Sequence, residues 1–99
     1  MSLKLLLDSA DPVTWEEWLP SGLFLGVTTN PSLLKQAGQP CQFNNLKHLA
    51  EKAQQMGARE IHLQAWGESI NELTDCGKAL GELATAEMSV SVKIPITRL

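Results

Sequence analysis

Lys93 is the residue whose type and position most strongly indicate covalent chemistry in this chain. It stands between Val92 and Ile94, and an ammonium group that faces inward between such neighbours is costly unless it is paired or deprotonated. Desolvation and neighbouring cations lower the pKa of a lysine, and the neutral amine can then attack a carbonyl group to form a Schiff base. The competing interpretation is a structural salt bridge between Lys93 and Asp8.

Four further polar residues could complete a site around such an imine. Asp8 could accept or return the proton of a substrate hydroxyl during carbon–carbon cleavage, and it is not needed as a helix cap because Asp11 is better placed for that task. The neutral residues Thr28, Asn30 and Gln64 could fix polyol hydroxyls or a water molecule. Asn30 could equally cap the helical turn that follows it, so both interpretations stay open.

The histidine and cysteine residues do not indicate a metal or an organic cofactor. His62 does not form a ligand set by itself, and we expect it to be a hydrogen-bonded interior residue. Cys41 and Cys76 lie far apart without a CxxC pair, so we expect two free thiols that fill small apolar gaps. Neither a GxGxxG segment nor a P-loop occurs. These residues therefore do not predict a metal site.

Helical patterns alternate with four short leucine-rich or β-branched runs, at 3–7, 23–29, 60–66 and 88–95. Asp11-Pro12 and Asn30-Pro31 predict helix starts. The apolar spacing that predicts the two longer helices is carried by Leu46, Leu49, Ala50 and Ala53, and by Ile70, Leu73, Gly77, Leu80 and Ala84. Gly57 is expected to end the first of them, and Gly77 and Gly81 would let the second approach the sheet closely. Strands that alternate with helices predict a parallel sheet with right-handed crossovers.

Strand parity separates the aliphatic residues from the polar ones. Alternate residues of a strand face opposite sides, and one parity of each run is aliphatic: Leu3, Leu5 and Leu7; Leu25, Val27 and Thr29; Ile61, Leu63 and Ala65; Val90, Val92 and Ile94. The polar candidates fall on the other parity, near the C-terminal strand ends. A doubly wound sheet buries both faces, whereas a (β/α)8 barrel gathers polar side chains at its C-terminal rim. The chain therefore predicts the first four β/α units of such a barrel, a half barrel.

Size and charge restrict the possible partners. The 99 residues suffice for one domain or less, and we expect residues 1–99 to form a single incomplete barrel domain. Eight Lys plus Arg against eleven Asp plus Glu give a net charge of −3, which argues against nucleic-acid and anionic membrane surfaces. The longest apolar runs fall far short of the roughly 20 residues that span a bilayer, and the N-terminus lacks the pattern of a secretory signal. We expect a cytoplasmic location.

Three segments resemble the transaldolase family. Gly26-Val27-Thr28-Thr29-Asn30-Pro31-Ser32-Leu33-Leu34 resembles its first signature, Leu5-Leu6-Leu7-Asp8-Ser9-Ala10 resembles its opening strand, and Val90-Ser91-Val92-Lys93-Ile94-Pro95-Ile96-Thr97 resembles the strand of its Schiff-base lysine. The resemblance implies a (β/α)8 barrel without a metal or organic cofactor. It also implies that Lys93 forms the imine with a ketose carbonyl, that Asp8 handles the hydroxyl proton, and that Thr28 and Asn30 hold the donor fragment.

The same resemblance implies an activity in sugar phosphate metabolism. A transaldolase of the pentose phosphate pathway transfers a dihydroxyacetone unit from a ketose phosphate, such as fructose 6-phosphate, to an aldose phosphate, whereas the related fructose-6-phosphate aldolase releases that unit. True transaldolases usually carry Glu where this chain has Gln64, which looks like the aldolase branch. That branch uses a later tyrosine, and this sequence contains none.

Besides Gln64, the length of the chain departs from the family pattern, because a (β/α)8 barrel typically needs about 250 residues and this chain has 99. An isolated half barrel leaves open strand edges that invite pairing with another copy, so a homo-oligomer is expected. The chain could be a fragment of a longer product, a short product that assembles with itself, or a remnant without activity. The alternatives to an enzyme are a non-catalytic half-barrel association module and a small α/β ligand-binding domain with both sheet faces covered.

Overall fold

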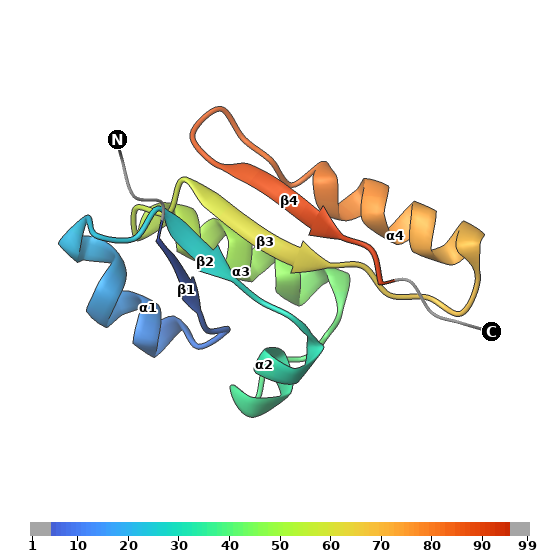
Figure 1. Cartoon of the computed structure of the whole chain (residues 1–99), viewed down its shortest axis with the longest axis horizontal. Helices are drawn as coiled ribbons and strands as arrows, with labels where there is room; N and C mark the ends of the chain where they lie inside the picture. The colour runs from blue at the N-terminus through green and yellow to red at the C-terminus, as the bar shows by residue number, and fades with distance from the viewer. Residues whose placement is uncertain (1–4, 96–99) are drawn as a thin grey trace.

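Helices and strands alternate along the chain in the predicted order (Figure 1). The computed structural model describes residues 5–95, so positions 3 and 4 of the first predicted strand and positions 96 and 97 of the lysine segment lie outside the described residues. The strands are β1 (Leu6–Asp8), β2 (Gly26–Thr28), β3 (Glu60–Gln64) and β4 (Ser89–Lys93). The helices are α1 (Pro12–Trp18), followed by the 3-10 turn η1 (Leu19–Ser21), then α2 (Pro31–Gln36), α3 (Phe43–Gln55) and α4 (Ile70–Gly81). Between residues 5 and 95 the structure has no helix with the length and apolar character needed to cross a membrane.

Local capping signals set the helix boundaries. Asp11 Oδ1 accepts the Val13 N–H at 3.0 Å before α1, and Asn30 Oδ1 accepts the Leu33 N–H at 2.9 Å before α2. In both helices a proline occupies the first turn, where its missing N–H costs nothing. Gly57 follows α3 with a φ of 102°, a left-handed conformation that favours glycine. The predicted caps and the predicted end of the first of the two longer helices are therefore confirmed.

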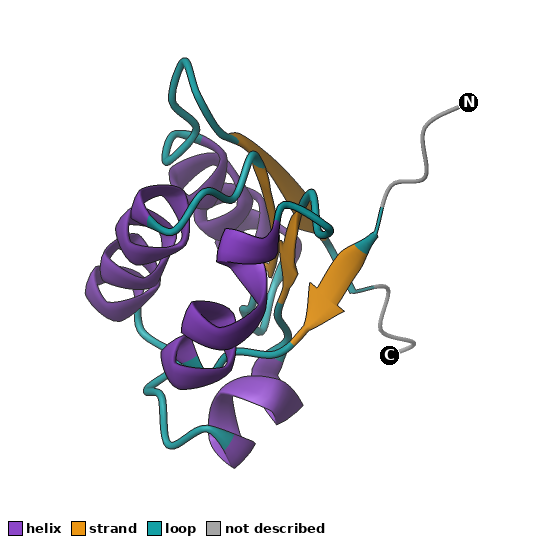
Figure 2. Ribbon diagram, turned by 90° about the vertical axis from the view of Figure 1, so that its left-hand side faces the viewer, coloured by secondary structure: helices purple, strands orange, loops and turns teal. Residues whose placement is uncertain are grey.

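The four strands form one parallel sheet in the order β1-β2-β3-β4. All the described helices lie on one side of this sheet, and its other side carries no helix (Figure 2). Within residues 5–95 the small α/β domain with both faces covered is thus wrong. A one-sided, all-parallel sheet is compatible with the first half of a (β/α)8 barrel, in which helices surround the strands and the opposite face points inward.

The hydrophobic core lies between the sheet and the helices, on the side that strand parity predicts. Val27, Ile61 and Leu63 are each at most 1% exposed. They form one cluster with helix-side residues, namely Trp15, Leu19, Leu34, Leu46, Leu49, Ala50, Ala53 and Leu80. Burial of this apolar surface is the main stabilising contribution to such a fold, and it fixes the strands so that their other face remains open.

Two large apolar residues at helix ends are exposed. Trp18, which shares a helix with the buried Trp15, is 46% exposed. It closes α1 and packs edge-on against Phe24, with the ring centroids 6.1 Å apart. Ile70 is 82% exposed, because it is the first residue of α4 and lies at the end of the helix. Apolar spacing alone therefore overestimates burial at the ends of helices.

The predicted close approach of α4 to the sheet is confirmed at Gly77 and wrong at Gly81. A Cβ at Gly77 would lie 3.5 Å from Ile94 Cδ1 and 3.8 Å from Val92 Cγ1, whereas at Gly81 it would meet nothing within 4 Å. Gly81 is the last residue of α4, and the predicted position Ala84 falls in the turn that follows. The approach of helix to sheet is thus confined to the middle of α4.

Candidate functional site

Lys93 and Gln64 are direct neighbours at the C-terminal ends of β4 and β3. Their Cα atoms are register partners, and the Ala65 N–H donates to the Lys93 carbonyl oxygen at 2.9 Å. Both side chains have the parity opposite to the core residues Leu63 and Val92, so they belong to the face without helices. The structure therefore brings the predicted nucleophile and the predicted amide together.

Asp8 and Thr28 form a second pair, on the other half of the same face. Their Cα atoms are register partners. In the same register row across the sheet, Thr28 pairs with His62 on β3 and His62 pairs with Ser91 on β4. At the usual strand spacing of about 4.8 Å, β1 and β4 lie about 14 Å apart, and Lys93 stands two residues beyond Ser91 along β4. Within the described range the only ion pair is the one between His62 and Glu60, so the alternative salt bridge of Asp8 with Lys93 is wrong there. The candidate site consists of two pairs rather than one cluster.

Lys93 is exposed, which corrects the expectation of a buried inward-facing amine. The physical reason is that four strands do not surround a lumen, so water reaches the face on which Lys93 stands. Asp8 is likewise exposed, while Thr28, Asn30 and Gln64 are half-buried. The desolvation that favours a neutral amine would therefore have to come from protein that covers the open face.

Asn30 serves as a helix cap in this structure. Its Oδ1 accepts the Leu33 N–H at 2.9 Å, which confirms the capping interpretation. The side-chain nitrogen of an asparagine amide still carries two donors, so a cap and a contact with a substrate hydroxyl are compatible. Thr29, on the core side, is 5% exposed and its hydroxyl donates to the His62 carbonyl oxygen at 3.1 Å.

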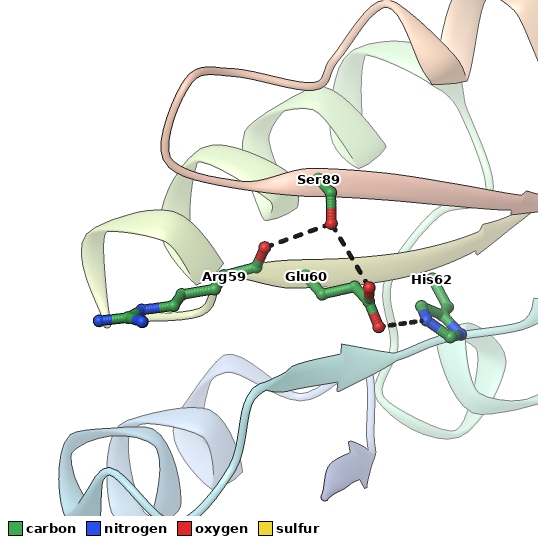
Figure 3. A network of polar contacts seen from close by, with 4 residues as sticks. All are labelled: Arg59, Glu60, His62 and Ser89. Atoms are coloured by element: carbon green, nitrogen blue, oxygen red, sulfur yellow. Dashed lines mark hydrogen bonds and ion pairs between the residues drawn. The ribbon is translucent and has the colours of Figure 1, made fainter. Parts of the chain in front are cut away.

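A polar network lies on the open face near the N-terminal ends of β3 and β4, whereas the Lys93–Gln64 pair lies at their C-terminal ends (Figure 3). Glu60 Oε2 is 2.9 Å from His62 Nε2, and the Ser89 Oγ is 3.4 Å both from Glu60 Oε1 and from the Arg59 carbonyl oxygen. The hydrogen bond expected for His62 is confirmed, but the expected interior position is wrong, because the side chain is 33% exposed. Sequence reasoning missed Glu60, and the signal was available because residues two apart in a strand share a face.

A hollow of about 200 Å³ adjoins the C-terminal end of β1. It lies between the β1–α1 loop and α2, and its polar lining residues are Asp8, Ser9, Asp11, Thr14 and Gln36. The hollow reaches Asp8 but neither Gln64 nor Lys93. Between residues 5 and 95 no three His, Cys, Asp or Glu side chains gather as a metal site would require.

The two cysteines are free and differ in exposure. Cys76 is half-buried and its Sγ accepts the Trp66 N–H at 3.5 Å, as expected for a thiol that fills a gap. Cys41 is exposed, so the same expectation is wrong for Cys41. Partial burial of its thiol nevertheless raises the pKa of Cys41 above the ordinary value, and the nearby Cys76 raises it further.

The raised pKa predicts slow alkylation of Cys41 near neutral pH. The thiolate is the reactive form, so a higher pKa lowers its fraction at any pH below that pKa. We expect the pH midpoint for alkylation by iodoacetamide to lie above that of a cysteine in a short unstructured peptide, as measured by peptide-resolved mass spectrometry. The variant Cys76→Ser should lower the midpoint part of the way. A midpoint at or below that of the peptide would contradict this prediction.

Comparisons with known proteins relate the whole chain to one group of enzymes. The chain is 27% identical over 95 residues to a probable transaldolase of Cereibacter sphaeroides and 32% identical over 98 residues to a probable transaldolase of Phenylobacterium zucineum. These matches cover 96% and 97% of the chain but only 40% and 41% of the relatives. No protein-family model matches the chain. The similarity is weak, extends over nearly the whole chain and supports a relation to transaldolases without distinguishing the branches of that family.

Proposed function

We propose that this chain supplies the imine-forming part of a transaldolase-type (β/α)8 barrel, with Lys93 as the nucleophile. The observation that carries the proposal is the register pair of Lys93 and Gln64 at the C-terminal end of a parallel sheet, on its open face. This is the end at which (β/α)8 enzymes have their active sites. The similarity to probable transaldolases over 96% of the chain supports the same chemistry.

The proposed reaction begins with imine formation. The amine nitrogen of Lys93 adds to the carbonyl carbon of a ketose phosphate of the fructose 6-phosphate type, and water leaves. The carboxylate of Asp8 then accepts the proton of the hydroxyl group that becomes an aldehyde. The carbon–carbon bond breaks, its electron pair passes to the imine to form an enamine, and the aldehyde departs. The three-carbon unit stays bound to Lys93 until hydrolysis or transfer.

Thr28 and Asn30 are proposed to hold the hydroxyl groups of the bound three-carbon unit. Thr28 lies between Asp8 and His62 in the register row, and Asn30 stands two residues further along the chain. The hydroxyl of Thr28 and the free donors of the Asn30 amide suit a polyol. Because Asp8 lies three strands from Lys93, the reaction further requires that the sheet curves and that additional strands enclose its open face.

Gln64 favours release of the dihydroxyacetone unit over its transfer, because an amide cannot exchange a proton as a carboxylate can. We expect fructose 6-phosphate alone to yield free dihydroxyacetone, and Gln64→Glu to raise the share of product that requires an aldose phosphate acceptor. Chromatography of the products with and without that acceptor measures the share. A wild-type protein that forms product only with the acceptor present would favour the transferase instead.

Borohydride trapping tests the proposed function. The chain is incubated with dihydroxyacetone or fructose 6-phosphate, the imine is reduced, and the intact mass is measured. We expect one covalent adduct per chain, because reduction converts the reversible imine into a stable amine. A chain that acquires no adduct at saturating dihydroxyacetone would contradict the proposal. If such a chain still associated with itself, it would fit the non-catalytic association module instead.

A further inference from the structure

The Lys93–Gln64 pair lacks a group that can take up a proton while Lys93 is bound in an imine. In the imine, the nitrogen of Lys93 is part of a carbon–nitrogen double bond, and hydrolysis requires that the attacking water lose a proton to a base. Gln64 carries a neutral amide, which does not exchange a proton as a base would. Asp8 is assigned to the substrate hydroxyl and lies on β1, three strands from β4. The proposed chemistry therefore needs a second proton acceptor close to Lys93.

His62 is a titratable residue of the open face that lies diagonally across from Lys93. Its Cα pairs with that of Ser91, which stands two residues before Lys93 on β4. One strand spacing of about 4.8 Å and a rise of about 6.6 Å over two residues place the Cα atoms of His62 and Lys93 about 8 Å apart. Long and aromatic side chains bridge such a diagonal. A water molecule that attacks an imine on Lys93 can therefore lie between that imine and the imidazole ring.

Glu60 holds the imidazole of His62 in one orientation (Figure 3). Glu60 Oε2 lies 2.9 Å from His62 Nε2, and Ser89 Oγ lies 3.4 Å from Glu60 Oε1, so both carboxylate oxygens have a partner. An ionised carboxylate only accepts hydrogen bonds, which requires that Nε2 carry the hydrogen. In the neutral ring the lone pair then belongs to Nδ1. A carboxylate that fixes the tautomer in this way prepares a histidine for proton transfer through its other nitrogen.

Within residues 5–95, Glu60 is the ion-pair partner of His62. The neighbours of His62 in the register row on β2 and β4 are neutral hydroxyl residues, and the helices lie on the other side of the sheet. The other charged strand residues of the open face are Lys93 on β4 and Asp8 on β1, the latter two strands away at about 10 Å. Imidazole is the side chain that ordinarily changes its charge between pH 5 and 8. With Lys93 held in the imine, a pH dependence in that range reports on His62.

We propose that His62 is the base that hydrolyses the imine on Lys93, with Glu60 as the residue that positions it. The inference rests on the proposed function and adds the step that completes the catalytic cycle. Water adds to the imine carbon, and its proton passes to Nδ1 of His62. The imidazolium returns this proton to the nitrogen of Lys93, the carbon–nitrogen bond breaks with its electron pair on nitrogen, and the hydroxyl proton passes to the freed amine. The products are a free carbonyl compound, the ammonium form of Lys93 and a neutral His62.

The decay of a preformed imine measures this step. The chain is saturated with dihydroxyacetone and the free ligand is removed by rapid gel filtration. Borohydride added after increasing delays converts the remaining imine into an adduct, which intact mass quantifies. We expect the wild-type rate to rise between pH 5 and 8, because the neutral imidazole is the base. His62→Gln keeps a hydrogen-bonding side chain that cannot take up a proton, so it should slow the decay at pH 8 by about 100-fold and remove most of the rise.

Glu60→Gln distinguishes the base from the residue that positions it. In this variant the imidazole remains but its tautomer is no longer fixed. The imine should therefore decay more slowly than in the wild type and faster than in His62→Gln, and the decay should still rise with pH. A Glu60→Gln chain that decays at the wild-type rate would remove the positioning role of Glu60.

Two exposed helix positions provide matched controls. His48 on α3 is the other histidine of the chain, and Glu16 lies on α1, so His48→Gln and Glu16→Gln should decay like the wild type. Circular dichroism and the adduct at zero delay show that each variant folds and forms the imine. If His62→Gln decays at the wild-type rate with the same rise, the inference is wrong while Lys93 stays the nucleophile. A wild-type chain without any adduct would instead contradict the proposed function, and the inference with it.

Discussion

Lys93→Met is expected to abolish borohydride trapping of dihydroxyacetone. Methionine keeps an unbranched side chain of similar length but has no nitrogen with which to form an imine, so the covalent step itself is lost. Because Lys93 is exposed, the substitution should change the free energy of unfolding by no more than about 0.5 kcal/mol. The expected result is therefore a folded protein whose intact mass does not increase after reduction.

Lys78→Met is the matched control for this prediction. Lys78 is exposed on α4, on the helix side of the sheet, and its loss should leave the adduct unchanged. If Lys93→Met still acquired one adduct while keeping its fold, another amine would be the nucleophile and the assignment of Lys93 would be wrong. If both variants lost the adduct, the effect could not be specific to the strand end.

Gly26→Ala is expected to cause the largest loss of stability. A Cβ at Gly26 would collide with the backbone carbonyl oxygen of Glu60, which is also its register partner on β3. A side chain could rotate out of the way, but the backbone of a paired strand cannot, so β2 and β3 would have to separate. We expect a loss of about 3 kcal/mol in the free energy of unfolding, a large part of the roughly 5–15 kcal/mol that holds a domain folded.

Urea denaturation followed by circular dichroism measures this loss, with Gly81→Ala as the control. A Cβ at Gly81 would meet nothing within 4 Å, and alanine is the better helix former by up to about 1 kcal/mol, so that variant should be as stable as the wild type or slightly more so. A Gly26→Ala chain with an unchanged denaturation midpoint would contradict the strand contact on which the register depends.

Local signals in the sequence predict most of the fold. The caps at Asp11 and Asn30 depend on a few consecutive residues, and strand parity depends on alternation within one strand. For this reason the helix starts, the parallel order and the core face are all confirmed. The pairing of Gln64 with Lys93 follows from the same parity once the strands are in register.

Exposure could not be predicted, because it depends on what lies across from a residue rather than beside it in sequence. Lys93 has the parity of a barrel lumen, yet four strands leave that face open to water. Trp18 and Cys41 similarly occupy positions whose residue types suggest burial, but they lie at a helix end and in a loop where no second layer covers them. Strand parity places Glu60 on the same face as His62, but its contact with Ser89 depends on the register between β3 and β4.

Locating the borohydride adduct tests the central claim most directly. Cleavage after glutamate releases residues 88–99, a peptide in which Lys93 is the only lysine, so its mass reports on that one side chain. The account predicts that, after reduction with dihydroxyacetone, all of the added mass resides in this peptide. An adduct on any other lysine or on the N-terminal amine, with residues 88–99 unmodified, would contradict it.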